Sequence, residues 1–360
     1  KVSPRFHFFA TLMVSLGSMF SAIWIVVANS WQQTPAGHHI VQMMRDGKPW
    51  FDSAGNPVMR AEVVDFWGVV FNPSTVERLT HTLIGAFIMG AFFIMSISAY
   101  YLLTRRHEEF ARRSFTGALI FGTIFSLAQL VSGDSNSRMV ARHQPAKLAA
   151  FEGHFETRPA GLTLFGWPDV ESRRMRGGIA IPGLLSLLVH GDRDKPVLGL
   201  DAVPPAYWPP VLASFISFRL MVGIGMLFIV LTLVASFLRW RGTLFDKRWL
   251  MWTFVFAVIL AVAGNQLGWI AAEIGRQPWV VHPRVERDAG GNFVLDPAGL
   301  VTYHMDEGLL TNKAVSEALH GSQVVGSIVM FGLVYLLLLA VWILVLNSKI
   351  HKGPEPVAIA

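Results

Sequence analysis

The sequence contains no cysteine in its 360 residues. This absence excludes disulfide bonds, iron–sulfur clusters, thiolate-ligated haem, covalent c-type haem and cysteine-based zinc sites within the chain. Charge is also scarce, because only 15% of the residues are charged, against about 25% in an average soluble domain. With 52% hydrophobic residues, this composition excludes an ordinary cytosolic enzyme and indicates a protein embedded in a membrane.

Long apolar runs occupy much of the chain. A bilayer core of about 30 Å needs roughly 20 apolar residues of helix, and in lipid the backbone must satisfy its own hydrogen bonds. We therefore predict an all-α integral membrane protein with six transmembrane helices and long loops on the outer side. The predicted spans are residues 8–29, 79–103, 115–132, 211–238, 249–274 and 321–347.

Lysine and arginine distinguish the two sides of this arrangement. Six spans place both termini and the loops 104–114 and 239–248 on one side, in short segments rich in basic residues. The positive-inside rule makes this side the cytoplasm. The net charge of +6 therefore reflects topology, and without a continuous basic patch interleaved with aromatics we expect no nucleic-acid partner.

We divide the chain by these spans. The loop at 30–78 belongs to the first part, and a further outer segment covers 275–320. The parts are residues 1–132 with the first three spans, 133–210 as an outer loop, 211–348 with the last three spans, and 349–360 as a cytoplasmic tail predicted to be disordered after Lys352.

One histidine lies clearly inside a predicted span. Of 12 histidines, His81 is placed in the second span, near its outer end. A neutral imidazole at this depth can ligate haem iron through one ring nitrogen. Alternatively, the ring bonds a helix carbonyl, and the residues alone leave both interpretations open.

Met221 is the candidate for a second axial ligand, because methionine is a known haem ligand. It lies near the outer surface at the start of the fourth span, two residues after Arg219, which could meet a haem propionate. Gly85 and Gly225 follow the two candidates by one turn and would let a flat ring approach. The alternative is ordinary packing of small residues between membrane helices.

Polar residues also gather at the end of the fifth span. Asn265, Trp269 and Glu273 are spaced to share one helix face. A carboxylate beside tryptophan in a dry site can relay protons. The alternative is that Glu273 simply pairs with Arg276, three residues later, and the residues alone slightly favour that pairing.

Lys147 and Glu152 lie in the stretch PAKLAAFEGHFETRP of the long outer loop. A cationic donor and a carboxylate at a membrane surface suit a quinol headgroup, which must release protons as well as electrons. The alternative, favoured before any family resemblance is considered, is a solvated amphipathic helix.

Six motifs together resemble subunit I of the cytochrome bd quinol oxidases. The resemblance extends over nearly the whole chain except the tail, and the last motif is the sharpest. The motifs are NSWQQTP at 29–35, RLTHTLIGAF at 78–87, KLAAFEGHFETRP at 147–159, TLFGWPD at 163–169, FRLMVGIG at 218–225 and GWIAAEIGRQPW at 268–279.

The resemblance implies roles for the ligand and quinol candidates. His81 and Met221 match the axial ligands, and hence the metal ligands, of the low-spin haem b of the family. Arg219 matches the arginine beside them. Lys147 and Glu152 match residues of the quinol loop that are implicated in quinol oxidation.

The resemblance also implies an oxygen-reducing centre. Glu273 matches the acidic residue beside a high-spin haem b, Trp269 falls in the same pocket, and Arg276 lies in the same haem-adjacent region. The implied cofactors are a low-spin haem b, a high-spin haem b and haem d. These matches favour the functional interpretation of Met221, Lys147 and Glu273 over the alternatives.

The implied function is that of a terminal quinol oxidase in a bacterial inner membrane. Such an enzyme oxidises quinol at the periplasmic side, reduces O2 to water and generates a proton-motive force. Subunit II is the implied partner, together with membrane quinol and O2. The resemblance leaves open whether small single-helix subunits are also present.

The sequence departs from the family in two ways. Family members have nine spans in this subunit, whereas six are predicted here; the missing amino-terminal third carries a histidine ligand and glutamates of a proposed proton path. We therefore expect the sequence to be a fragment of a longer subunit. The outer loop at 133–210 is short, which resembles the short-loop, cyanide-insensitive-type branch.

Two other functions compete with this interpretation. A diheme b-type quinol electron-transfer protein normally needs about four buried histidines, and only His81 fits. A secondary transporter would use Glu273 and Arg276 at its substrate site, but transporters often carry internal repeats and we detect none in the sequence.

Overall fold

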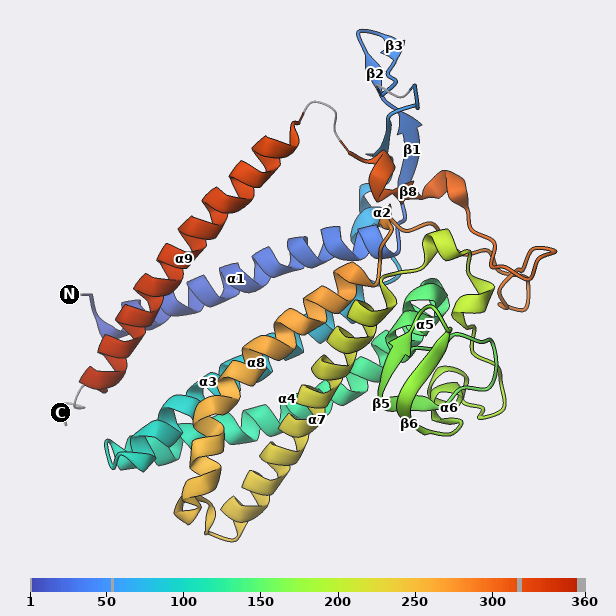
Figure 1. The fold of residues 1–360 in the computed structure, drawn as a ribbon. Coiled ribbons are helices and arrows are strands. Elements are labelled where there is room, and N and C mark those ends of the chain that lie inside the picture. Colours follow the sequence, from blue (N-terminus) through green and yellow to red (C-terminus); the bar gives the residue numbers. More distant parts are fainter. Residues whose placement is uncertain (1, 53–54, 316–318, 355–360) are drawn as a thin grey trace.

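Six long helices dominate the computed structural model, which describes residues 2–52, 55–315 and 319–354 (Figure 1). Each is long and apolar enough to cross a membrane, which confirms the predicted all-α fold with six spans. The helices are α1 (Pro4–Gln33), α3 (Thr75–Leu103), α4 (Glu108–His143), α7 (Val211–Trp240), α8 (Arg248–Ile274) and α9 (Gly321–Lys352).

Helix α4 extends well beyond the predicted third span. The prediction ended this helix at residue 132, but the helix continues through the polar stretch to His143. Asp134 pairs with Arg138 one turn later at 3.0 Å, and Val140 is buried. The helix therefore continues into the segment predicted as the outer loop, because hydropathy reports where a chain leaves lipid and not where its helix ends.

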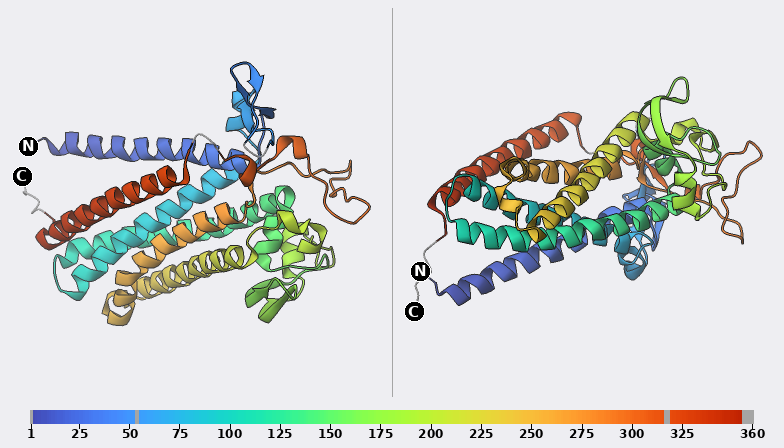
Figure 2. Two further views of the ribbon diagram at one scale, coloured as in Figure 1. Left: turned by 45° about the horizontal axis from the view of Figure 1, so that its top comes forward. Right: turned by 90° about the horizontal axis from the view of Figure 1, so that it is seen from below.

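Four of the helices, α3, α4, α7 and α8, pack into one bundle (Figures 1 and 2). Its core is aromatic. Phe92 stacks on Phe228 with ring centroids 4.0 Å apart, and Phe115 meets Phe254 edge-on at 5.0 Å. These buried rings contribute specific packing geometry, which a membrane bundle needs because lipid tails offer no hydrophobic driving force between helices.

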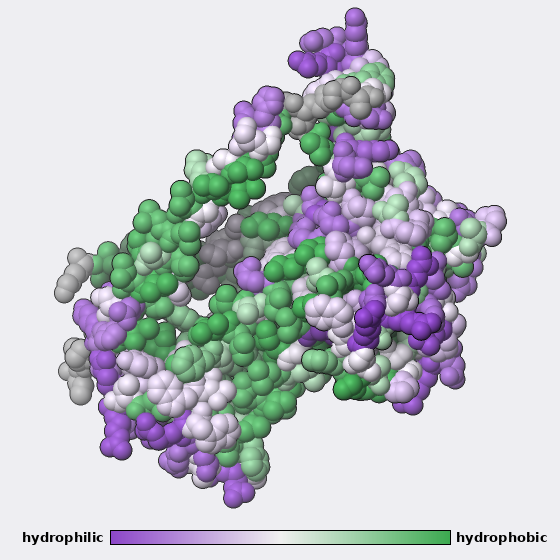
Figure 3. All heavy atoms as spheres, viewed as in Figure 1, coloured by the Kyte–Doolittle hydropathy of each residue, from purple (hydrophilic) through white to green (hydrophobic). Residues whose placement is uncertain are grey.

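Helices α1 and α9 lie outside this bundle. The carboxyl-terminal part of α1 packs on α3 and buries Val26 and Val27. Helix α9 touches α3 through Trp342, whose ring lies 6.3 Å from that of Phe93. Apolar side chains cover the helices in Figure 3, and those of α9 are exposed, as expected for surfaces that face lipid or another subunit.

The segment between α1 and α3 forms a projecting hairpin and a short helix (Figure 1). Strand β1 pairs antiparallel with β4, and β2 pairs with β3 at the hairpin tip. The elements are β1 (His38–Gln42), β2 (Met44–Arg45), β3 (Lys48–Pro49), β4 (Met59–Val63) and α2 (Phe66–Val70).

The remaining outer segments are also ordered. Strands β5 and β6 form an antiparallel hairpin, and β7 pairs with β8. The apolar stretch 179–190 ends β6 and then forms α6, whose Leu185 packs into the cluster that contains Val140 of α4. The elements are α5 (Pro145–Glu152), β5 (Leu162–Asp169), β6 (Arg174–Ile181), α6 (Leu184–His190), β7 (Trp279–Val281), β8 (Leu309–Leu310) and the 3-10 turns Leu200–Ala202, Pro205–Tyr207, Met305–Glu307 and Thr311–Lys313. A further 3-10 turn, Leu244–Asp246, lies between α7 and α8.

The molecule has two distinct ends. The hairpins and short helices gather at one end of the bundle, whereas the α3–α4 and α7–α8 turns, the start of α1 and the end of α9 lie toward the other (Figures 1 and 2). Lys349–Lys352 continue α9, and residues 355–360 of the predicted tail lie outside the described residues.

Candidate functional site

His81 is the seventh residue of α3, which places it about 9 Å along the helix from its outer start. Two side chains of α4 contact its ring. Nδ1 lies 3.3 Å from Oγ of Ser132, and Nε2 lies 3.0 Å from the amide nitrogen of Gln129. In the part of the chain that the structure describes, neither ring nitrogen bonds a backbone carbonyl, so the carbonyl alternative is wrong.

Met221 is the eleventh residue of α7, about 15 Å from the start of that helix. Its Sδ faces α8 at Gly268, where a Cβ atom would lie only 3.0 Å from the sulfur. Asn265, one turn earlier on α8, faces Gly85 of α3 in the same way, because a Cβ atom on that glycine would lie 3.0 Å from the Asn265 Oδ1. Helix α8 therefore links the helix of His81 to the helix of Met221.

The two glycines that follow the ligand candidates differ. Gly85 packs against Asn265, so its small size serves the contact between α3 and α8. A Cβ atom on Gly225 would meet no described heavy atom within 4 Å. Open space is therefore present at Gly225, one turn after Met221. At Gly85, the contact with α8 explains why the residue is small.

Arg219 and Glu152 form a buried ion pair between α7 and α5. The Arg219 guanidinium also donates to the carbonyl of Phe151 at 3.3 Å. Burial raises the pKa of the Glu152 carboxyl, and the Arg219 charge opposes that rise. The Nε of Arg219 is buried without a hydrogen-bond partner among the described residues, so this arginine holds Glu152 and still has a donor to offer.

Lys147 lies on another face of α5, since five residues separate it from Glu152 and a helix turns 100° per residue. Its Nζ donates to Oε1 of Gln33 at 2.8 Å and to the carbonyl of Ala272 at 2.9 Å. Burial lowers the Lys147 pKa well below its usual range. All residues of α5 are buried, so the solvated-helix alternative is wrong.

Gln33 connects three helices at this end of the bundle. Its Oε1 also accepts from Gln144 at 3.1 Å, and its amide nitrogen donates to the Ala272 carbonyl at 3.1 Å. That carbonyl belongs to the last turn of α8, where backbone acceptors have no partner within the helix. Arg78 donates to Gln144 at 3.3 Å and extends the network to α3.

Gly275 is the point at which α5 approaches the end of α8. A Cβ atom at this position would lie 2.9 Å from Cε1 of Phe151 and 3.0 Å from Cε of Lys147. Both distances are shorter than side chains tolerate without displacement. The close approach of these α5 side chains to the backbone at the end of α8 therefore requires glycine.

Glu273 pairs with Arg276 at 2.5 Å, which is the structural alternative that the sequence offered. It also accepts a hydrogen bond from the amide of Asn29 on α1, while Arg276 donates to Gln32 at 2.8 Å. Trp269, one turn earlier on α8, is half-buried. The ion pair is therefore anchored to α1 rather than free in solvent, and the buried Nε of Arg276 has no partner within the described part of the chain.

The sequence predicted neither the Arg219–Glu152 pair nor the anchoring by α1. Arg219 was assigned to a haem and Glu152 to a separate quinol segment, but their side chains meet. Asn29 and Gln33 fall within the motif NSWQQTP, which was the available signal. Their partners lie more than 110 residues away, so spacing along the chain could not identify those contacts.

Residues 1–354 match the family model described as Cytochrome bd terminal oxidase subunit I. The chain belongs to this family. It is 30% identical over 366 residues to the cytochrome bd ubiquinol oxidase subunit 1 of Bacillus subtilis, covering 99% of this chain and 70% of that protein. It is 31% identical over 342 residues to the cytochrome bd-II ubiquinol oxidase subunit 1 of Escherichia coli, covering 76% of this chain and 64% of the relative.

A third relative and a solved structure agree with this assignment. The putative cytochrome bd menaquinol oxidase subunit I of Bacillus subtilis is 35% identical over 290 residues, covering 78% of this chain and 61% of its own length. The bd oxidase structure from Geobacillus thermodenitrificans superposes with a TM-score of 0.73 at 27% identity, covering 98% of this chain and 72% of that one. The chain thus spans between 61% and 72% of these proteins.

Membership in the cytochrome bd family makes this a membrane protein of a haem-binding family, and it disfavours the diheme and transporter alternatives. The Nε2 of His81 faces the Gln129 amide nitrogen, a contact that iron at this ring nitrogen would replace. Two features fit a haem: the sulfur of Met221 faces a glycine, and the buried Nε of Arg219 lacks a partner among the described residues. A buried orphan donor close to a candidate ligand suits a propionate.

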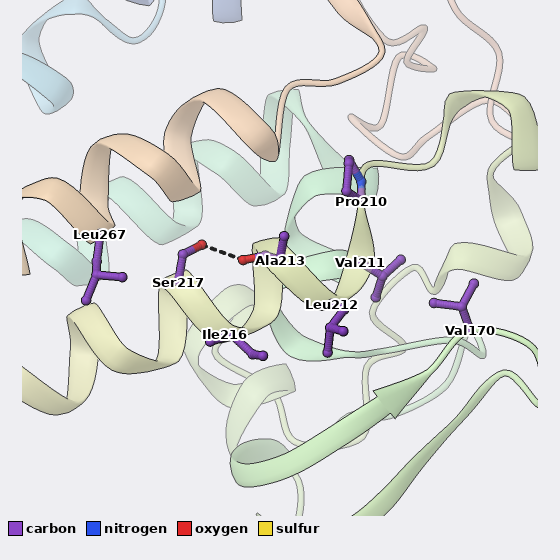
Figure 4. A pocket seen from close by; sticks show the side chains of 8 residues that line it. All are labelled: Val170, Pro210, Val211, Leu212, Ala213, Ile216, Ser217 and Leu267. Carbon is purple, nitrogen blue, oxygen red and sulfur yellow. Dashed lines mark hydrogen bonds between the residues drawn. The ribbon is translucent and has the colours of Figure 1, made fainter. Parts of the chain in front are cut away.

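An apolar pocket of about 540 Å³ lies at the outer start of α7 (Figure 4). Ser217, whose hydroxyl donates to the Ala213 carbonyl at 2.7 Å, lies two residues before Arg219 on α7. The pocket and the Arg219–Glu152 pair therefore share the first turns of α7. Its lining residues are Val170, Pro210, Val211, Leu212, Ala213, Ile216, Ser217 and Leu267.

Proposed function

We propose that this chain is the haem-binding subunit of a terminal quinol oxidase, which oxidises quinol at its outer side and reduces O2 to water. The observation that carries the proposal is the placement of His81 and Met221 on two helices of one bundle, joined through α8. Quinol oxidation outside and proton uptake from inside would generate a proton-motive force.

The first part of the proposal concerns a low-spin haem b. His81 through Nε2 and Met221 through Sδ would hold this haem, and the Nε of Arg219 would bind a propionate. Bound haem supplies one-electron chemistry, which no side chain of this chain can perform. The protein sets the ligands, their orientation and the burial around them.

The second part concerns the oxygen-reducing centre, with a high-spin haem b and haem d in the assembled enzyme. Glu273 would be the catalytic carboxylate of this centre, Trp269 would line the same region, and Arg276 would bind a haem there. Asn29 and Arg276 both bond the Glu273 carboxylate, so they hold it in one orientation. A carboxylate held in this way can accept and release a proton at a defined atom.

The third part concerns quinol. Glu152 accepts a proton from the quinol hydroxyl, while Arg219 keeps the carboxylate in place. Lys147 holds α5 against α1 and α8 through Gln33 and the Ala272 carbonyl, and so fixes the position of Glu152. The apolar pocket at the start of α7 suits the hydrocarbon part of the substrate.

The fourth part concerns orientation and partners. The basic turns between the spans face the cytoplasm of a bacterial inner membrane, and the hairpins and short helices face the periplasm. Subunit II packs against part of the apolar helix surface that this chain exposes. Nucleic acid is not among the proposed partners.

Spectroscopy of the assembled complex tests the proposal. We expect the purified complex to show a reduced-minus-oxidised spectrum with low-spin and high-spin haem bands, and to consume oxygen when quinol is added. A folded complex that contains no haem would contradict the proposed function. Haem without quinol-dependent oxygen uptake would contradict the oxidase assignment.

A further inference from the structure

The ring of His81 is held on both sides by helix α4. Gln129 and Ser132 are three residues apart on that helix, so they share one face. Ser132 Oγ lies 3.3 Å from Nδ1, and the Gln129 amide nitrogen lies 3.0 Å from Nε2. The next residue, Gly133, would bring a Cβ atom to 3.7 Å from Cε1 of the ring. Helix α4 therefore forms one wall of the His81 site.

These contacts determine which ring nitrogen carries the proton. An amide NH2 group can only donate hydrogen bonds, so Nε2 of His81 must be the acceptor facing Gln129. In a neutral imidazole the proton is then on Nδ1, from which it is donated to the Ser132 hydroxyl oxygen. Iron bound at Nε2 would take the lone pair that accepts from Gln129, so the amide would give up this contact, whereas the Nδ1 proton and its bond to Ser132 would stay.

We propose that Ser132 is a positioning residue for His81, which fixes the ring's tautomer and rotation and tunes the low-spin haem. The inference rests on the proposed function, because it requires His81 to be an axial ligand. It adds a residue that the ligand motif RLTHTLIGAF does not contain, since Ser132 lies 51 positions from His81.

The expected effect follows from ligand basicity. A hydrogen bond from Nδ1 to an acceptor makes the imidazole a stronger electron donor through Nε2. A stronger donor stabilises ferric over ferrous iron and so lowers the midpoint potential. Removing the Ser132 hydroxyl should raise that potential, because the ligand then donates less electron density.

The test compares Ser132→Ala and Ser132→Val with Ser132→Thr in the assembled complex. Threonine keeps the hydroxyl, whereas valine matches the shape of threonine without it. By potentiometric titration of the low-spin haem band, we expect alanine and valine to raise the ratio of reduced to oxidised haem at a fixed potential by about three- to tenfold. Threonine should titrate like the wild type.

The outcomes separate this inference from the proposed function. A wild-type potential in both Ser132→Ala and Ser132→Val, with the haem bound, would overturn the inference and leave the haem assignment intact. If Ser132→Ala prevents haem binding, a complex that binds haem with Ser132→Thr but not with Ser132→Val supports the inference. Loss of haem from both Ser132→Thr and Ser132→Val overturns it. A wild-type complex without a low-spin haem would instead refute the proposed function.

Discussion

Buried charge is the dominant feature at the scale of single residues. Lys147 and Glu152 lie on one short helix, yet their charged atoms reach different partners: Gln33 and a helix carbonyl for the lysine, Arg219 for the glutamate. Removing one member of a buried pair typically costs about 3–5 kcal/mol. Substitutions here affect both chemistry and stability, so each needs a control that separates the two.

Replacement of Met221 tests the second haem ligand. Met221→Leu nearly conserves volume, so the bundle should fold with a cost below about 1.5 kcal/mol, but no sulfur remains to bind iron. We expect the low-spin band of the reduced spectrum to be lost or shifted. Met226→Leu, at a more exposed position of the same helix, is the control. A wild-type reduced spectrum in Met221→Leu would remove Met221 as a ligand.

Replacement of Glu152 tests the quinol site. Glu152→Gln keeps the shape but removes the proton-accepting charge, so quinol-driven turnover should fall by roughly 10²-fold, as expected for loss of a general base. Oxygen reduction from an artificial electron donor should fall much less, and Lys147→Ala should show the same asymmetry. Glu156→Gln, in an exposed pair with Arg158, is the control. Equal losses in both assays would contradict a quinol role.

At the scale of elements, short outer segments are fitted against the ends of long helices. Helix α5 lies against the last turn of α8, where Lys147 and Gln33 bond the Ala272 carbonyl. This satisfies a backbone acceptor that the helix leaves free. The contact is close because Gly275 has no side chain.

The fit between α5 and α8 can be tested at Gly275. Gly275→Ala places a methyl group 2.8 Å from the Ala271 carbonyl oxygen of α8 and 2.9 Å from the Phe151 ring of α5, and such overpacking typically costs about 1–3 kcal/mol. We expect a lower Tm in thermal unfolding followed by tryptophan fluorescence. Gly223→Ala, where a Cβ atom meets no described atom within 4 Å, should leave the Tm nearly unchanged. Equal Tm values for the two variants would mean that α5 yields without cost.

The segment after α8 should be sensitive to acid through His282. Its ring lies between Trp279 and Tyr303, with centroids 6.2 and 6.1 Å away. Burial, aided by the charges of Lys147 and Arg276, lowers the His282 pKa to about 3. The folded pKa lies below the unfolded value of about 6.5, so the unfolded state binds more protons between these values. Stability is therefore lost as pH falls from about 6.5 toward about 3.

Unfolding at several pH values measures this contribution. One proton changes the free energy of unfolding by about 1.4 kcal/mol per pH unit. We expect the wild type to lose stability more steeply than His282→Gln between about pH 6.5 and about pH 4.5. His154, whose pKa burial also lowers, is present in both proteins and cancels in the comparison. Parallel curves for the two proteins would show that His282 does not titrate on unfolding.

At the scale of the whole molecule, the chain has an apolar middle between two more hydrophilic ends (Figure 3). The end with the α3–α4 and α7–α8 turns carries Arg105, Arg106, Arg241 and Lys247. This polarity predicts orientation in the membrane, and the absence of cysteine makes the prediction simple to test. We expect Ser172→Cys, in the turn between β5 and β6, to react with an impermeant maleimide in right-side-out spheroplasts. Glu109→Cys, near the α3–α4 turn, should react only after lysis, and the reverse pattern would invert the topology.

The sequence by itself determined the membrane class, the six spans, the two-sided distribution of charge and the family motifs. These properties follow from local transfer free energies and from short strings of residues, which need no tertiary contacts to be recognised. The same local reasoning placed His81, Met221 and Glu273 near the outer ends of their helices.

Only the tertiary structure decided how these residues are held. It extended α4 through a polar stretch that hydropathy excludes, paired Glu152 with Arg219, and brought Asn29 to Glu273 across 244 positions. The physical reason is that a buried polar group must find a hydrogen-bond partner wherever packing brings one. The packing of the helices determines which residue becomes that partner, and the spacing of residues along the chain does not reveal it.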